Sequence, residues 1–80
     1  NPVGWFLKGE VDLRQQRWND ADVAFARAQA LYPNVETALR HHQVRLAGKL
    51  PEPARPLQQA LAFDPGNPVL LNALASYYIS

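Results

Sequence analysis

The sequence contains no cysteine, which excludes disulfide bridges and metal sites built on thiolates. No apolar run approaches the ~20 residues that a membrane-spanning helix needs. The net charge is only +1, with eight Lys or Arg against seven Asp or Glu, so the strong basic excess of a typical nucleic-acid binder is missing. Four scattered glycines form no phosphate-binding loop. These absences argue against disulfide-stabilised, membrane-spanning and nucleic-acid-binding proteins.

What the sequence does contain is typical of a small folded helical protein. Its 80 residues fit one domain. It is 48% hydrophobic and 19% charged, whereas disordered chains combine low hydrophobicity with high net charge. Alanine is abundant, while Val and Ile are few and Thr occurs once. Because β-branched residues favour strands and alanine favours helices, this composition predicts an all-α fold.

Capping and helix-breaking residues divide the chain into five segments that we expect to be helical. They cover about 3–16, 20–31, 35–47, 53–63 and 68–80. Asn19 or Asp20 would cap the second helix, Gly48 would end the third, and Asn67 would cap the fifth. Pro56 fits only the first turn of the fourth helix, where its missing N–H has no intrahelical partner to lose. The connections are short, so successive helices should be antiparallel neighbours.

The segments repeat along the chain. Phe25 aligns with Leu57 at a shift of 32 residues, and the strings Ala28-Gln29-Ala30-Leu31-Tyr32-Pro33 and Ala60-Leu61-Ala62-Phe63-Asp64-Pro65 match at the same shift. Gly9 aligns with Ala75 at a shift of 66. The order of segments is therefore A-B-A-B-A, which is the signature of a helical repeat protein.

The repeated residues resemble the tetratricopeptide repeat (TPR) family, whose pattern is Trp-x2-Leu-Gly-x2-Tyr, then Ala-x3-Phe, Ala and a closing Pro. The residues that match this motif or take the place of its members are Trp5, Gly9, Trp18, Ala21, Phe25, Ala28, Pro33, Gly48, Leu57, Ala60, Pro65, Leu74, Ala75 and Tyr78. Lys8 and Asp12 depart from it, standing where the motif has Leu and Tyr.

The resemblance implies antiparallel helical hairpins in a right-handed superhelix of about five helices. The first hairpin would cover 1–33, the second 34–65, and 66–80 would be the first helix of a third, truncated repeat, within a longer array. Small residues such as Gly9 and Ala28 would let paired helices approach closely, while Trp5 and Phe25 fill the space between them.

The resemblance also implies a non-catalytic scaffold with a concave surface that receives a peptide or a partner's helix, without a cofactor or metal. The residues that we expect to face this groove are Phe6, Glu10, Leu13, Arg14, Arg40, Asn72 and Ser76. TPR proteins that grip a carboxylate tail use a Lys/Asn/Arg clamp, but Phe6, Glu10, Val69 and Ala73 stand at clamp positions here, which argues against chaperone-tail binding.

Three functional hypotheses stay open. The first is a protein-interaction scaffold in a larger bacterial assembly, for example in the envelope or in polysaccharide export, with the periplasm slightly favoured over the cytoplasm. The second is a structural module that self-associates through Tyr77, Tyr78 and Ile79 of an exposed last helix. The third is a weak binder of an anionic polymer or nucleic acid. Its cations would come from the basic middle repeat, Arg40, Arg45, Lys49 and Arg55.

Catalytic and metal chemistry find little support in the sequence. His41 and His42 are adjacent, so on a helix they point about 100° apart and cannot chelate one ion as an i, i+4 pair can. We expect them to lie on the surface or to line a groove. Ser76 and Ser80 have no nearby base. The acids Glu10, Asp12, Asp20 and Asp22 alternate with Lys8, Arg14 and Arg17, which predicts a solvated, ion-paired face rather than a catalytic carboxylate pair.

Overall fold

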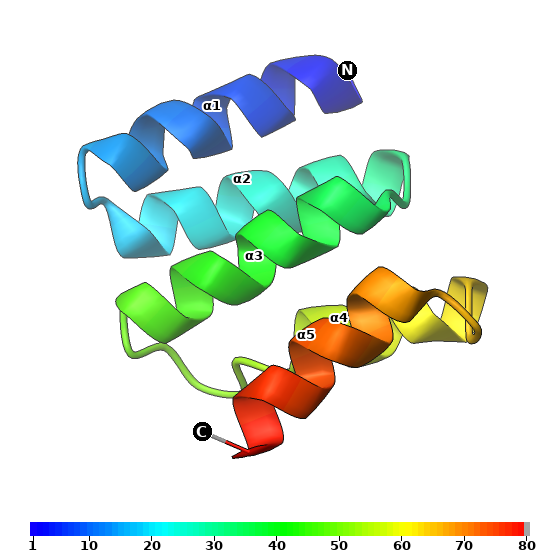
Figure 1. Cartoon of the computed structure of the whole chain (residues 1–80). Coiled ribbons are helices and arrows are strands. Elements are labelled where there is room, and N and C mark those ends of the chain that lie inside the picture. The colour runs from blue at the N-terminus through cyan, green and yellow to red at the C-terminus, as the bar shows by residue number, and fades with distance from the viewer. Residues whose placement is uncertain (80) are drawn as a thin grey trace.

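A computed structural model describes residues 1–79 as five α-helices joined by short connections, with no strand in that range (Figure 1). The helices are α1 (Pro2–Arg14), α2 (Trp18–Leu31), α3 (Val35–Ala47), α4 (Arg55–Phe63) and α5 (Pro68–Ile79). The all-α prediction and the number of helices are confirmed. No helix in the described range is long and apolar enough to cross a membrane.

Three helices begin at an asparagine that caps their free backbone N–H groups. The Oδ1 atom of Asn1 accepts a hydrogen bond from the Val3 N–H at 3.0 Å, and that of Asn34 accepts one from Glu36 at 2.8 Å. Asn67 Oδ1 accepts from Val69 at 2.9 Å. The predicted cap at Asn67 is therefore confirmed. Each such cap stabilises its helix by roughly 1 kcal/mol.

Two predicted helix starts are wrong. The second helix begins at Trp18, so neither Asn19 nor Asp20 caps it, and no side chain at Arg17 takes that role. The fourth helix begins at Arg55, two residues after the predicted Pro53. The 3₁₀-like bond from the Arg55 N–H to the Glu52 carbonyl, 3.1 Å long, forms a turn there first. Pro56 lies in the first turn of α4, as predicted.

Each helix packs on the next one along the chain, and α3 also contacts α5. Their buried side chains form two separate cores. The first core consists of Ala21, Phe25 and Val44, with Phe6, Leu13, Trp18 and Leu50 around it. The second core consists of Ala38, Leu57, Ala60 and Leu70, with Val35, Leu39, Leu61, Ala73 and Leu74 around it. Because α3 supplies a buried residue to each core, it is the helix that joins the two halves of the molecule.

Gly9 lets α1 lie close against α2. A Cβ atom built at Gly9 would come within 2.8 Å of the Phe25 ring, which is fully buried. The Phe6 ring meets the Phe25 ring edge-on, with 5.5 Å between the ring centroids, an arrangement that aromatic pairs favour. The small and large residues at these positions therefore fit together as one packing unit.

The connection between α3 and α4 packs equally closely at Gly48. A methyl group there would lie 2.5 Å from Cβ and 2.6 Å from Cγ of Trp18. Since Cβ is fixed to the backbone, only a shift of α2 against the end of α3 could relieve the clash. We expect Gly48→Ala to lower the free energy of unfolding, measured by urea titration, by about 1–3 kcal/mol.

The matched control for this substitution is Gly4→Ala. Gly4 is exposed on α1, and the nearest atom to its added methyl group would be 4.0 Å away. Removing a glycine from an exposed helix should raise the free energy of unfolding by about 0.5–1 kcal/mol. Equal effects of the two substitutions would contradict the close packing at Gly48.

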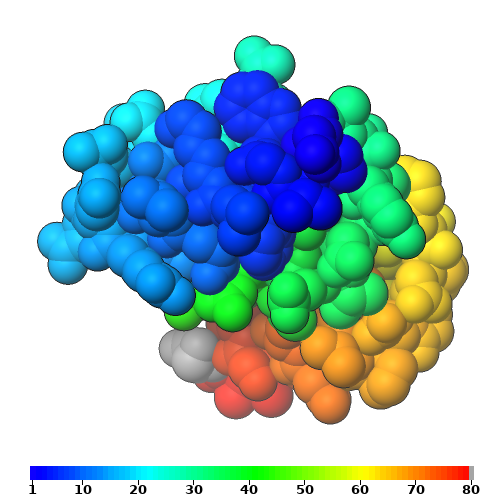
Figure 2. All heavy atoms as spheres, turned by 90° about the horizontal axis from the view of Figure 1, so that it is seen from above, coloured from blue at the N-terminus to red at the C-terminus, as the bar shows by residue number. Residues whose placement is uncertain are grey.

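Apolar side chains also remain on the outside. Val3, Leu7 and Val11 follow one another along the outer face of α1, the helix that occupies the centre of Figure 2, and each is more than half exposed. At the other end of the molecule Phe63 is 72% and Ile79 is 86% exposed. Both ends of the helical stack thus present apolar surface to solvent.

Candidate interaction surface

One hollow in the surface lies between α1 and α3. It has a volume of about 230 Å³. Its lining residues are Pro2, Val3, Phe6, Ala28, Tyr32, Asn34, Glu36 and Thr37. The lining includes the Phe6 ring, which packs on Phe25 of α2, and the small buried residue Ala28. This hollow is open to solvent and large enough for one side chain.

The second hollow lies between α3 and α5 and has a volume of about 450 Å³. It is lined by His42, Leu46, Ala73, Ser76 and Tyr77. The rings of His42 and Tyr77 meet edge-on, with their centroids 5.6 Å apart. In Figure 1 these two helices lie in front of α2 and α4. The hollow is largely apolar, and the polar side chains in its lining are Ser76, His42 and Tyr77.

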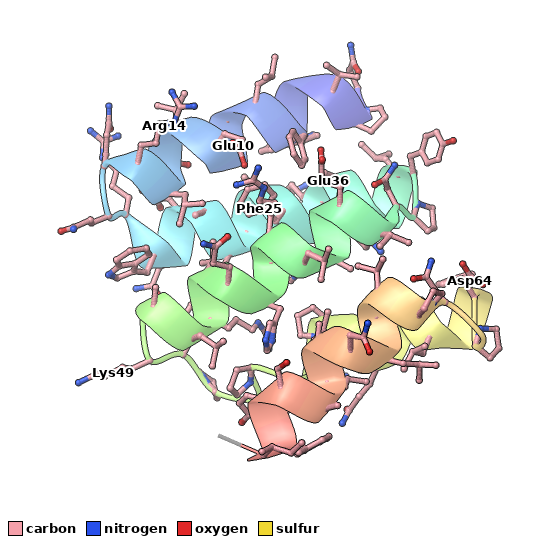
Figure 3. All side chains as sticks on the ribbon, in the orientation of Figure 1. Glu10, Arg14, Phe25, Glu36, Lys49 and Asp64 are labelled. Carbon is pink, nitrogen blue, oxygen red and sulfur yellow. The ribbon has the colours of Figure 1, made fainter. Side chains whose placement is uncertain are left out.

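An ion pair joins α1 to α3. Arg40 Nε lies 3.4 Å from Glu10 Oε1, and this oxygen is buried without a hydrogen bond. Figure 3 shows Glu10 directed from α1 towards the centre of the molecule, with Arg14 one turn away on the same helix. Along α3, Arg40 stands between Thr37 of the first hollow and Leu46 of the second. Because the Arg40 side chain is 40% exposed, it remains accessible to a partner.

The predicted groove residues are thus only partly brought together. Phe6 lines the first hollow and Ser76 the second, and Glu10 pairs with Arg40. Leu13 packs against the first core instead of lining a hollow. Arg14 and Asn72 are exposed and line neither hollow.

Sequence reasoning missed several residues that line the two hollows. They are Thr37, Leu46 and Tyr77. Two of the three lie on α3, where the sequence shows no clear motif residue, and their position depends on how α3 packs between α1 and α5. From the sequence, these lining residues could be found only by aligning the repeats so that the register of α3 was fixed.

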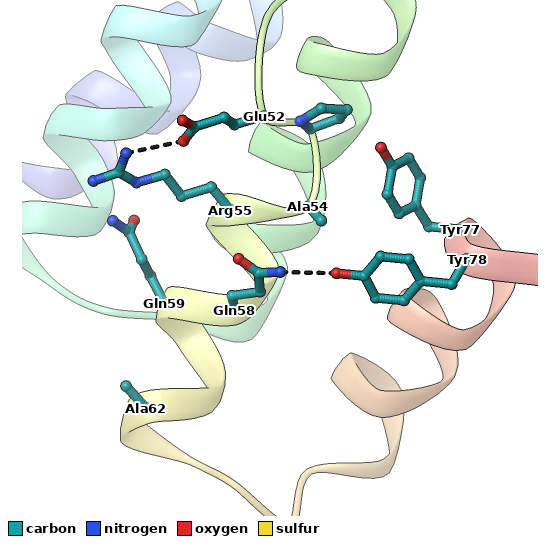
Figure 4. A pocket seen from close by; sticks show the side chains of 9 residues that line it. Glu52, Ala54, Arg55, Gln58, Gln59, Ala62, Tyr77 and Tyr78 are labelled. Carbon is teal, nitrogen blue, oxygen red and sulfur yellow. Dashed lines mark hydrogen bonds and ion pairs between the residues drawn. The ribbon is translucent and has the colours of Figure 1, made fainter.

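A third hollow, about 670 Å³, separates α4 from the end of α5 (Figure 4). The Gln58 Nε2 group donates a hydrogen bond of 2.8 Å to Tyr78 Oη across it. Of the residues predicted to mediate self-association, Tyr78 and Ile79 are exposed, whereas Tyr77 packs partly inward against His42. This hollow therefore borders the exposed end of α5.

The two histidines are buried, so the surface alternative for them is wrong. Their exposed fractions are 6% for His41 and 8% for His42, and His42 lines the second hollow. His41 Nε2 donates a hydrogen bond of 2.5 Å to Asp22 Oδ1, and Arg45 Nε donates one of 2.9 Å to the same oxygen. Among residues 1–79 no group of three potential metal ligands occurs. The histidines serve packing and hydrogen bonding.

The predicted solvated acidic face is also partly wrong. Asp12 is only 3% exposed, and its carboxylate pairs with Lys8 Nζ at 2.7 Å. Arg17 Nη1 lies 3.9 Å from the other Asp12 oxygen. Asp22 is likewise partly buried and bonded to α3. The ion pairing was predicted, but Asp12 is buried against Lys8 and Arg17, and Asp22 links α2 to α3 instead of facing water.

The buried His41 makes the stability of the protein depend on pH. Burial lowers the pKa of His41 below its ordinary value of 6.5, although the hydrogen bond and the charge of Asp22 raise it; the Arg45 charge lowers it further. The folded chain therefore binds this proton at a lower pH than the unfolded chain does. The free energy of unfolding should be highest above pH 6.5 and should fall as the pH drops through the folded-state pKa.

Urea titrations of the wild type and His41→Gln at pH 7.5 and pH 5 test this expectation. The wild type should lose more of its free energy of unfolding between the two pH values than the variant, because the variant cannot take up this proton. The same loss in both proteins would assign the pH dependence to other groups.

No family model, no curated protein and no solved structure matches this chain. The resemblance to TPR proteins consequently rests on the chain's own sequence motifs alone.

Proposed function

We propose that the chain is a TPR-like, non-catalytic module that binds a peptide or a helix of a partner protein on the surface formed by α1, α3 and α5. The observation that carries this proposal is the pair of hollows on either side of α3, which has the accessible Arg40 between them along its length. The surface combines apolar depressions with a charged group, as protein-binding surfaces commonly do.

Two packing contacts support the TPR-like superhelix. Gly9 meets Phe25, and both occupy motif positions. Gly48 meets Trp18, which stands three residues before the motif residue Ala21. In both contacts a glycine meets a large ring, which gives α2 the close contacts with α1 and with the end of α3 that a stacked array needs. A superhelix of this kind places the first helix of each repeat on one face, which is the face that bears the two hollows.

The partner that fits is a short segment with apolar side chains spaced to enter the two hollows. Volumes of about 230 and 450 Å³ suit single side chains or pairs of them rather than a folded domain. The anionic-polymer alternative has less support, because three of the four cations in the middle repeat have partners within the chain. Arg40 pairs with Glu10, Arg45 with Asp22, and Arg55 with Glu52.

A peptide library displayed on phage and panned against the chain tests the proposal. Peptides selected on the wild type should bind Leu46→Arg or Ser76→Arg at least about tenfold more weakly, because each new side chain fills the second hollow. The matched control is Val23→Arg on α2, whose side chain is half exposed and lines neither hollow. Peptides that lose affinity only for the Val23 variant, or a selection without enrichment, would contradict the proposal.

The exposure of the α5 end favours self-association as a second candidate function. Tyr78 is 64% exposed and lies beside Ile79, which is still more exposed. Sedimentation velocity at increasing concentration should then show a growing dimer fraction, which Ile79→Arg abolishes. A monomer at all concentrations would eliminate this candidate and leave peptide binding untouched.

A further inference from the structure

The connection between α3 and α4 is held by side chains of α3 at three successive carbonyl groups. Arg45 Nη1 donates hydrogen bonds to the carbonyl oxygens of Pro51 at 3.0 Å and of Glu52 at 3.3 Å. His42 Nδ1 donates one of 2.6 Å to the next carbonyl, that of Pro53. Backbone carbonyls of a connection commonly face water, so their capture by two side chains of one helix is a specific arrangement.

Asp22 on α2 fixes the orientation of Arg45. Its Oδ1 atom accepts the hydrogen bond of Arg45 Nε at 2.9 Å as well as that of His41. The guanidinium group is therefore bonded on one side to α2 and on the other side to the connection. Because Arg45 Nε and Nη1 belong to one planar group, the carboxylate on one edge directs the other edge at the carbonyls.

The backbone of this connection adopts a conformation that it would not favour alone. Lys49 has φ of 55° and Glu52 has φ of 53°, both in the left-handed region. Residues with side chains avoid that region because Cβ approaches the following carbonyl oxygen. The side-chain hydrogen bonds thus offset a conformational cost that lies within residues 49–52.

On α3, Ala38 belongs to the second core and Val44 to the first. His42 and Arg45, which bond to the connection, lie on the two sides of Val44 in the sequence. Beyond the connection, α4 and α5 are attached to the rest of the molecule through the second core and through the contact of His42 with Tyr77. A change at the connection should therefore weaken the attachment of α4 and α5 more than the packing of α1 and α2.

We propose that Asp22, His42 and Arg45 form a latch that keeps α4 and α5 docked on α3. When this latch is released, α4 and α5 detach together as one unit while α1, α2 and α3 remain folded. The latch would be a conformational device of the fold, and it does not depend on which partner the module binds.

Hydrogen exchange measured by mass spectrometry on the full chain tests the latch. Arg45→Met removes the Arg45 hydrogen bonds to the carbonyls of Pro51 and Glu52 and to Asp22, while the bond of His42 to Pro53 remains. This substitution should speed hydrogen exchange of the amides in 55–79 by about tenfold or more. Each lost hydrogen bond from a charged donor contributes substantially to the stability of the docked α4 and α5. Exchange in 18–31 should stay within about twofold of the wild type, because local opening leaves the first core intact.

The matched control is Arg55→Met. Arg55 belongs to the same region, but it is exposed and pairs only with the Glu52 side chain at 2.9 Å, so exchange should be unchanged throughout. Asp22→Asn, which keeps the shape of the side chain and removes its charge, serves if Arg45→Met does not fold, and it should likewise speed exchange in 55–79. Equal acceleration of 18–31 and 55–79, no acceleration of 55–79, or the same acceleration by Arg55→Met would each overturn the proposal.

Discussion

Phe25→Ala should lower the free energy of unfolding by about 3–5 kcal/mol, because it removes the largest fully buried side chain and leaves a cavity. The Phe25 ring fills the space that Gly9 leaves open and contacts Phe6 edge-on. Gly9 cannot fill the cavity that the substitution leaves, because it has no side chain. A small domain has a total stability of roughly 5–15 kcal/mol, so this loss is a large share of it.

Urea titration followed by circular dichroism at 222 nm measures this loss. The control is Val23→Ala on the same helix, where the side chain is half exposed and the expected change is within about 0.5 kcal/mol. A loss below about 1 kcal/mol for Phe25→Ala would mean that the ring does not fill a closed core.

Leu57→Ala should have the second-largest effect, about 2–5 kcal/mol. Leu57 is fully buried in the second core, against Ala38 of α3 and Leu70 of α5. Its loss should weaken α4 and α5 most, because they depend on this core. Both tryptophans, Trp5 and Trp18, lie on α1 and α2, so their fluorescence reports on the other half of the molecule.

In the Leu57→Ala variant, the urea midpoint from circular dichroism should therefore fall further than the midpoint from tryptophan emission. Leu71→Ala on α5 provides the control, since Leu71 is 46% exposed and its truncation should change the free energy of unfolding by less than about 0.5 kcal/mol. Coincident midpoints would show that the two cores unfold as one unit.

The helices could be predicted because their signals are local. Asn67 with Pro68 marks the start of a helix, and the Pro33-Asn34 pair marks the boundary between two helices. Both signals are independent of the rest of the chain. The start of α2 could not be predicted in this way, because Trp18 joins the helix through its packing against Gly48, which lies 30 residues further along the chain. Tertiary contact decided the boundary in place of a capping side chain.

The polar residues illustrate the same limit. The carboxylate that binds His41 belongs to Asp22 on another helix, so no spacing within residues 35–47 reveals it. Arg45, predicted as a surface cation, is likewise bonded within the molecule by that carboxylate. Of the residues predicted to face a groove, Phe6 and Ser76 line hollows, whereas Leu13 points inward because its side of α1 faces the first core.

Because every helix packs on its neighbour along the chain, most of the contacts that stabilise the fold join residues close in sequence. Chains with such local contacts lose little loop entropy before they gain packing energy, and they fold within microseconds to milliseconds. Little of the apolar surface would then stay exposed for long during synthesis. The outer residues of α1 and α5, which remain uncovered in the finished fold, would be the places where newly made chains first meet one another.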